Sequence, residues 1–151
     1  MSSFPLPPPM KRALELAEAA GAQGDVPVGA VVTDKTGAVI GEGANHRQSN
    51  DPTAHAEVLA LRAAGSRRGS ARLDGCSLWV TLEPCAMCAG AIALARIETI
   101  CFGAEDPKGG AVVNGPRLFA QPTCHHRPEV MGGLGDAQSA ALLRAFFAAR
   151  R

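Results

Sequence analysis

Three side chains that bind metals, together with one nearby carboxylate, have types and spacings suited to hydrolytic chemistry. His55 and Glu57 are separated by one residue, and Cys85 and Cys88 by two. Zinc accepts imidazole and thiolate ligands, and three protein ligands leave a fourth position for water. Because zinc lowers the pKa of such a water to roughly 7, this set of residues predicts a catalytic zinc site.

The local context of each residue supports this prediction. Pro84 fits the first turn of a helix, so Cys85 and Cys88 would share one face of its N-terminal end. Unpaired N–H groups at that end favour thiolates. His55 and Glu57 stand near the start of another predicted helix, about 200° apart on a helical wheel. Glu57 is therefore expected to move protons beside the metal rather than to bind it.

Two other interpretations of the cysteine pair stay open. A C-x-x-C pair alone also suits a redox dithiol. A closed structural zinc site would need a fourth protein ligand. The sequence offers six candidates for that ligand: His46, Cys76, Cys101, Cys124, His125 and His126. Glu57 argues against a purely structural site, which has no use for a carboxylate, and the three remaining cysteines are interpreted as buried or partly buried thiols.

The elements that would position these residues alternate between strand and helix patterns. Helices are predicted at 10–20, 51–64 and 84–95 and from 136 onwards, and strands at 26–33, 38–42, 76–82 and 99–102. Asp51 and Pro52 are expected to start the second helix, while Gly21 and Gly65 end the first and second. The stretch 106–128 is expected to be largely loop. This alternation predicts an α/β fold with helices covering a sheet.

Length and composition fit one domain over residues 1–151, with 1–9 as an extended proline-rich lead. The formal net charge of +1 provides no overall attraction for nucleic acid, so a local patch would have to hold it. The first residues lack the pattern of a signal peptide, and the longest apolar stretch, 85–95, is too short to span a bilayer. We therefore expect a reduced, cytoplasmic protein without a membrane partner.

Longer segments carry a family resemblance. They read VPVGAV at 26–31, GEGAN at 41–45, DPTAHAE at 51–57, TLEPCAMCAGAI at 81–92, ARI at 95–97 and FGAEDPKGGA at 102–111. The combination of H-x-E with P-C-x-x-C marks zinc-dependent nucleobase deaminases. With the other segments, the sequence resembles the bacterial tRNA-specific adenosine deaminases over nearly the whole chain after the proline-rich lead.

This resemblance implies a three-layer cytidine deaminase-like fold, with a central mixed sheet covered by helices. It implies one Zn2+ per chain, held by His55, Cys85 and Cys88, with Glu57 as the catalytic acid and base. The implied reaction is hydrolytic deamination of adenosine to inosine at the wobble position of a tRNA anticodon loop. The implied partners are the anticodon stem-loop and a second copy of the chain in a homodimer.

Two alternatives to this function remain. The first is a free-base deaminase, acting on guanine or cytosine with the same zinc site. The second is a zinc-stabilised RNA-binding module without turnover, against which the intact Glu57 argues.

The resemblance also implies roles around the substrate. Asn45 would hydrogen-bond the flipped base, the main chain at Ala56 would meet it, and Val26 would pack against it. Asp106 and Lys108 match positions that meet the backbone of the anticodon loop. Without the resemblance, Asn45 is a plausible turn residue and the Asp106–Lys108 pair is ordinary loop charge.

The C-terminal helix matches the family's RNA-facing helix. Its matching residues are Phe146, Phe147, Arg150 and Arg151. By themselves the phenylalanines suit a core and the arginines a solvated helix end. His125 and His126 are expected to position a loop or to face the RNA.

Overall fold

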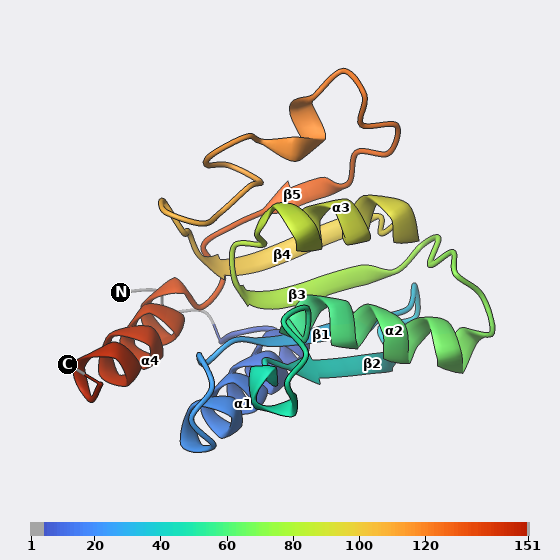
Figure 1. Ribbon diagram of the computed structural model, residues 1–151. Coiled ribbons are helices and arrows are strands. Elements are labelled where there is room, and N and C mark those ends of the chain that lie inside the picture. Colours follow the sequence, from blue (N-terminus) through green and yellow to red (C-terminus); the bar gives the residue numbers. More distant parts are fainter. Residues whose placement is uncertain (1–4, 151) are drawn as a thin grey trace.

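A five-stranded sheet forms the centre of the protein, whose computed structural model describes residues 5–150 (Figure 1). The strands are β1 (Gly29–Thr33), β2 (Val39–Ala44), β3 (Ser77–Leu82), β4 (Thr99–Ala104) and β5 (Glu129–Met131). Their order in the sheet is β2-β1-β3-β4-β5. β1 pairs antiparallel with β2 and β3, whereas β3–β4 and β4–β5 are parallel pairs. The sheet is therefore mixed, as predicted.

Helices cover both faces of this sheet. They are α1 (Pro8–Ala22), α2 (Ala56–Arg68), α3 (Ala86–Ala95) and α4 (Asp136–Ala148). Successive side chains of a strand point to opposite faces, and β1 is buried along its whole length. Ala30 and Val32 belong to the core beneath α2 and α3, whereas Val31 packs with α1. This three-layer α/β arrangement confirms the predicted fold class.

The contact between β2 and α2 sets the place of the second helix. Gly41 and Gly43 of β2 face the backbone of α2, and a Cβ atom on either would overlap a carbonyl oxygen of that helix, at Ala60 and Ala56 respectively. The helix can therefore lie directly on the strand only because both positions are glycine. This packing brings the N-terminal end of α2 to the end of β2.

The boundaries of α1 and β1 differ from the prediction. α1 begins at Pro8 and includes Pro9, since proline fits the first turn of a helix, so the predicted extended lead is too long. Residues 1–4 of that lead lie outside the described residues. The helix also continues through Gly21 to Ala22, and β1 begins at Gly29 rather than at Val26.

The second helix also begins and ends later than predicted. Asp51 does not cap it, because its Oδ1 accepts the N–H and hydroxyl of Thr53 in a separate turn. The helix starts at Ala56 and passes through Gly65 to Arg68. It ends at Gly69, whose φ of 72° suits a glycine after a helix.

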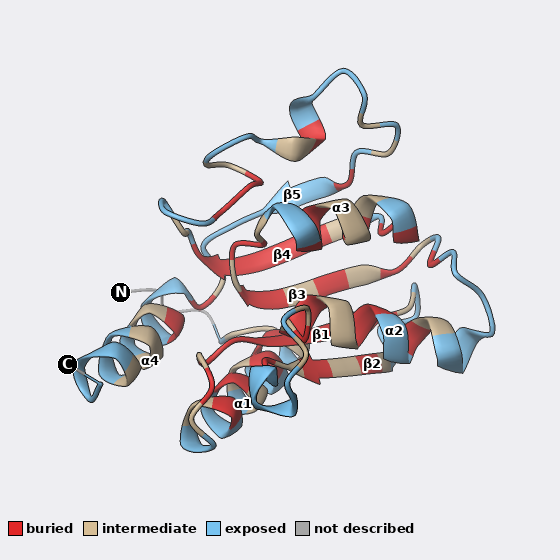
Figure 2. Cartoon of the chain, in the orientation of Figure 1, coloured by how far each residue is buried: buried red, intermediate tan, exposed pale blue. Residues whose placement is uncertain are grey.

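The C-terminal part of the chain has less regular structure and is more exposed to solvent than the rest. The stretch 106–128 is mostly loop, as expected, with a short 3-10 helix at Leu118–Ala120. β5 follows at the edge of the sheet and was not predicted. Figure 2 shows α4 largely exposed, and Ser139 is its buried residue. Phe146 and Phe147 are therefore not part of the core, although their residue type by itself suits one.

No helix in the described part of the chain is long and apolar enough to cross a membrane.

Candidate metal centre and active site

Three ligand side chains converge between the starts of α2 and α3. The Nδ1 atom of His55 lies 3.7 Å from Sγ of Cys85 and 3.6 Å from Sγ of Cys88. The potential donor atoms of the three residues lie within 4.8 Å of one another. In a tetrahedral site with bonds of roughly 2.3 Å to sulfur and 2.0 Å to nitrogen, such atoms are about 3.6 Å apart. The donor set and its spacing therefore fit one Zn2+.

The two helix starts explain why these side chains meet. His55 and Cys85 are the N-cap residues of α2 and α3, with extended backbones, and neither side chain caps its own helix. Cys88 lies one turn further along α3, on the same side as Cys85. The imidazole and both sulfur atoms are thus available to a metal, at a place where the helix dipoles favour negative charge.

The two cysteines have different acidities before metal binding. A hydrogen bond from Cys88 lowers the pKa of Cys85 to about 5, although burial acts in the opposite direction. The same hydrogen bond raises the pKa of Cys88, and burial raises it further. Cys85 is therefore the thiolate of the pair at neutral pH, ready for a soft metal ion.

Glu57 lies beside this cluster and is only 4% exposed. Burial, with a smaller contribution from the charge of Cys85, raises its pKa to about 7, although a backbone hydrogen bond acts in the opposite direction. A carboxyl group with that pKa can take up and release a proton at neutral pH. The helical wheel is not the right guide here, because His55 precedes the helix. Instead, the Glu57 side chain lies close enough to Cys88 for each group to affect the pKa of the other.

The six candidates for a fourth protein ligand lie outside the cluster that the described residues form. Cys76 accepts from Arg68, Nε2 of His126 lies 2.6 Å from the carbonyl oxygen of Ile97, and His46 faces Asp25. A metal held by His55 and the two cysteines would therefore keep a position for water, which is the arrangement of a catalytic rather than a structural zinc.

Asn45 and Ala56 are joined at the edge of this site. Oδ1 of Asn45 accepts the backbone N–H of Ala56 at 2.8 Å, so Asn45, which directly follows β2, caps the start of α2. This bond occupies the Ala56 N–H and leaves the Nδ2 end of the amide as the group that can donate elsewhere.

Val26 and Phe146 line one cavity of about 470 Å3 near the start of β1. The other lining residues come from the 24–25 and 47–52 segments. Phe146 and Phe147 make an edge-to-face pair with ring centroids 5.3 Å apart, and the Arg150 guanidinium stacks 3.6 Å from the Phe146 ring. Phe147 is 49% exposed, and Arg151 lies outside the described residues.

Asp106 and Lys108 lie on the loop that follows β4. Oδ1 of Asp106 accepts the N–H groups of Lys108 and Gly109, so this carboxylate shapes its own loop. The Lys108 side chain is exposed. Neither residue lines the cavity that contains Val26 and Phe146.

Two buried carboxylates were missed in the sequence. Glu83, two residues before Cys85, is 2% exposed, and Asp25 is 5% exposed. Burial alone would raise the pKa of Glu83, but hydrogen bonds from Asp106, Asn114 and Val112 together lower it. In the sequence, Glu83 stands between a predicted apolar strand and the P-C-x-x-C motif. A carboxylate in that position is expected to be buried and therefore to need hydrogen-bond donors.

A family model and individual relatives match the chain. The model of the cytidine and deoxycytidylate deaminase zinc-binding region matches residues 8–104, which include His55, Glu57, Cys85 and Cys88. The tRNA-specific adenosine deaminase of Agrobacterium fabrum is 49% identical over 142 residues, which cover 94% of this chain and 93% of that protein.

Solved structures share the fold. A tRNA:A34 deaminase, studied for A-to-I editing at the wobble position of transfer RNA, has a TM-score of 0.86 at 51% identity and covers 89% of this chain and 98% of its own. A guanine deaminase from Nitrosomonas europaea has a TM-score of 0.75 at 27% identity, covering 96% and 87%. With the zinc-fitting cluster, these similarities show that the chain belongs to the cytidine deaminase-like family of zinc-binding proteins, which includes the bacterial tRNA-specific adenosine deaminases.

Proposed function

We propose that this protein hydrolyses adenosine to inosine at the wobble position of a tRNA anticodon loop. The observation that carries the deaminase assignment is the His55–Cys85–Cys88 cluster with a buried carboxyl group of pKa about 7 beside it. The tRNA substrate is supported by 49% identity to a tRNA-specific adenosine deaminase over almost the full length of both chains. The net reaction consumes one water and releases ammonia.

Each residue of the site has a defined task in this reaction. His55, Cys85 and Cys88 hold the zinc, which when bound supplies an activated water at neutral pH. Glu57 would accept one proton from that water and pass it to a ring nitrogen, and would then take the remaining hydroxyl proton and pass it to the leaving amine. A pKa of about 7 suits both directions of transfer.

We assign base binding to Asn45, Val26 and the backbone at Ala56. Asn45 is bonded to Ala56, the residue that follows His55, and its Nδ2 group would donate to the flipped base. Val26 would supply an apolar contact from the cavity that it lines.

The anticodon stem-loop is the proposed partner because an unpaired loop presents a base for flipping at little cost. With a formal net charge of +1, the chain depends on a few local groups to hold phosphate. We assign this role to Lys108 and Arg150. Asp106 and Phe147 lie on the same two segments, and we propose that they contact other parts of the RNA. Because tRNA is the proposed substrate, we also propose that the protein is cytoplasmic.

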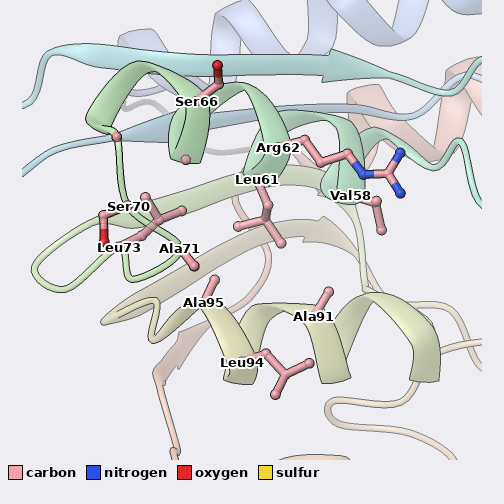
Figure 3. A pocket seen from close by; sticks show the side chains of 12 residues that line it. Val58, Leu61, Arg62, Ser66, Ser70, Ala71, Leu73, Ala91, Leu94 and Ala95 are labelled. Carbon is pink, nitrogen blue, oxygen red and sulfur yellow. The ribbon is translucent and has the colours of Figure 1, made fainter.

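A homodimer is the proposed assembly. A groove of about 690 Å3 runs between α2 and α3 and is lined mainly by apolar and small residues. Figure 3 shows Leu61 of α2 facing Ala91 and Ala95 of α3 across this groove. Leu94, which lines this groove, is 78% exposed, and Met87 on the same helix is 39% exposed. Exposed apolar side chains at an apolar groove are typical of an interface, and we propose that a second copy of the chain covers them.

The deciding experiment compares substrates for the purified zinc-loaded protein. We expect ammonia release and inosine formation on an anticodon stem-loop with adenosine at the wobble position. The matched control is the same hairpin with guanosine at that position. Free guanine, cytosine and cytidine complete the set, and faster turnover of guanine or cytosine than of the hairpin would replace this proposal with the free-base alternative.

A further inference from the structure

The Glu83 carboxylate is buried between two parts of the proposed site without a role in the reaction described above. It follows Leu82, the last residue of β3, and precedes the metal ligand Cys85 by two positions. Only 2% of Glu83 is exposed. Burying a carboxylate is costly unless other groups bind it. Here those groups are N–H donors from a loop that is distant in sequence.

Five hydrogen bonds connect Glu83 to that loop. Oε2 accepts the consecutive backbone N–H groups of Val112, Val113 and Asn114 at 3.0, 2.9 and 3.0 Å. Consecutive N–H groups turned to one side form a concave anion-binding nest. Oε1 accepts the backbone N–H of Asp106 at 3.0 Å and Nδ2 of Asn114 at 2.6 Å.

The loop is shaped to close around this carboxylate. A Cβ atom at Gly110 would overlap Cδ of Glu83 and approach the carbonyl oxygen of Asp106, so glycine allows the close approach. The next residue, Ala111, donates its N–H to the carbonyl oxygen of Pro84 at 2.9 Å. The loop is therefore attached to both residues that precede Cys85.

The same loop presents the residues that we assign to RNA contact. Asp106 gives its N–H to Glu83, and its own Oδ1 accepts the N–H groups of Lys108 and Gly109 at 3.2 and 3.0 Å. The turn that exposes Lys108 is thus built on a residue held directly by Glu83.

We propose that Glu83 is a positioning residue: its carboxylate fixes the 105–114 loop relative to Cys85 and so presents Lys108 to the RNA at a set distance from the metal. The RNA part of this inference rests on the proposed function. The loop-holding part does not, so the two can be tested separately.

The first test is limited trypsin digestion of the zinc-loaded full chain with Glu83→Gln. Glutamine keeps the shape but turns an NH2 group towards N–H donors. Because hydrogen bonds to charged groups contribute about 1.5–3 kcal/mol, we expect cleavage after Lys108 to accelerate about 10-fold or more. Cleavage after Lys35, in the exposed turn between β1 and β2, should not change. An unchanged rate at Lys108, or equal acceleration at both lysines, would overturn the inference.

Two further variants guard against a general loss of folding. Asn114→Ala removes one of the five hydrogen bonds without altering Glu83, together with the bond from the same Nδ2 group to Glu105. Because the four backbone N–H bonds to Glu83 remain, we expect a smaller effect, about 3-fold faster cleavage after Lys108. Glu129→Gln changes an exposed carboxylate in β5 and should leave both cleavage rates at the wild-type value. If Asn114→Ala behaved like Glu129→Gln while Glu83→Gln lost its fold, the loop would not depend on this carboxylate.

The second test separates binding from chemistry on the hairpin. With Glu83→Gln we expect KM to rise about 10-fold, kcat to stay within about 3-fold, and zinc to remain at one per chain. A fall in kcat at unchanged KM, or loss of zinc, would show that Glu83 supports the metal segment alone. If the wild-type protein does not act on the hairpin, the proposed function fails instead, and the cleavage rate at Lys108 still decides the role of Glu83.

Discussion

Glu57 is the residue on which the proposed chemistry depends most directly. It is buried beside the cluster but does not belong to it, so its removal should leave metal binding intact. We expect Glu57→Gln to retain one zinc per chain and to lose at least about 10²–10⁴-fold in turnover, the usual contribution of a general acid and base. Metal analysis and a single-turnover deamination assay measure the two effects. Glu98→Gln, at an exposed position, is the matched control, and near-wild-type turnover of Glu57→Gln would exclude the assigned role.

Cys85 should be the most reactive thiol of the metal-free protein. Its pKa is lowered to about 5, so the thiolate predominates above that pH, whereas burial raises the pKa of Cys101 to about 11 and keeps that thiol protonated. After zinc is removed by chelation, we expect iodoacetamide to modify Cys85 first at about pH 6.5, where an ordinary thiol with a pKa of about 8.5 reacts slowly. Peptide mass spectrometry locates the label. Bound zinc should protect Cys85, and earlier labelling of Cys101 would contradict the assigned acidities.

At the scale of elements, the packing of α2 on β2 places His55. Gly43→Ala would introduce a Cβ atom into the backbone of α2, and overpacking of this kind costs about 1–3 kcal/mol. We expect a lower free energy of unfolding in urea and weaker zinc binding, because the N-terminal end of α2 must move. The control is Gly90→Ala in α3, where a Cβ meets no atom within 4 Å. That change should stabilise the protein by about 0.5–1 kcal/mol, so equal destabilisation by both variants would refute the explanation.

The start of α2 shows where sequence reasoning about elements reaches its limit. Asp51 and Pro52 have the residue types of a helix start, but the same types also form the turn that the structure contains. The actual cap comes from Asn45, which is remote in sequence and becomes adjacent only once β2 packs beside α2. β5 was missed for a related reason, since three exposed residues carry no periodic pattern.

The metal-binding residues were easier to predict than their surroundings. Cys85 and Cys88 meet through local helix geometry, and the pairing with His55 follows from the family signature. Glu83 was not predicted, because its partners lie 23–31 positions away on a loop without regular structure. Interactions of this kind depend on tertiary packing and leave only a weak trace in one sequence.

At the scale of the whole molecule, the groove between α2 and α3 predicts the state of association. We expect light scattering to give twice the mass of one chain, and Leu94→Glu to give a monomer, because the charge would enter an apolar interface. Met131→Glu, at another exposed apolar residue on β5, should remain dimeric. A monomeric wild-type protein at working concentration would contradict the proposed assembly.

The two edge strands of the sheet, β2 and β5, affect the tendency of the folded protein to aggregate at high concentration. β5 is only three residues long. β2 has glycine at two of its six positions, and its pairing register with β1 shifts between Val32 and Thr33. Short or irregular edge strands are poor templates for pairing with a strand of another molecule. Aggregation through backbone pairing is therefore disfavoured at both ends of the sheet, and solutions of the native protein should resist fibril growth.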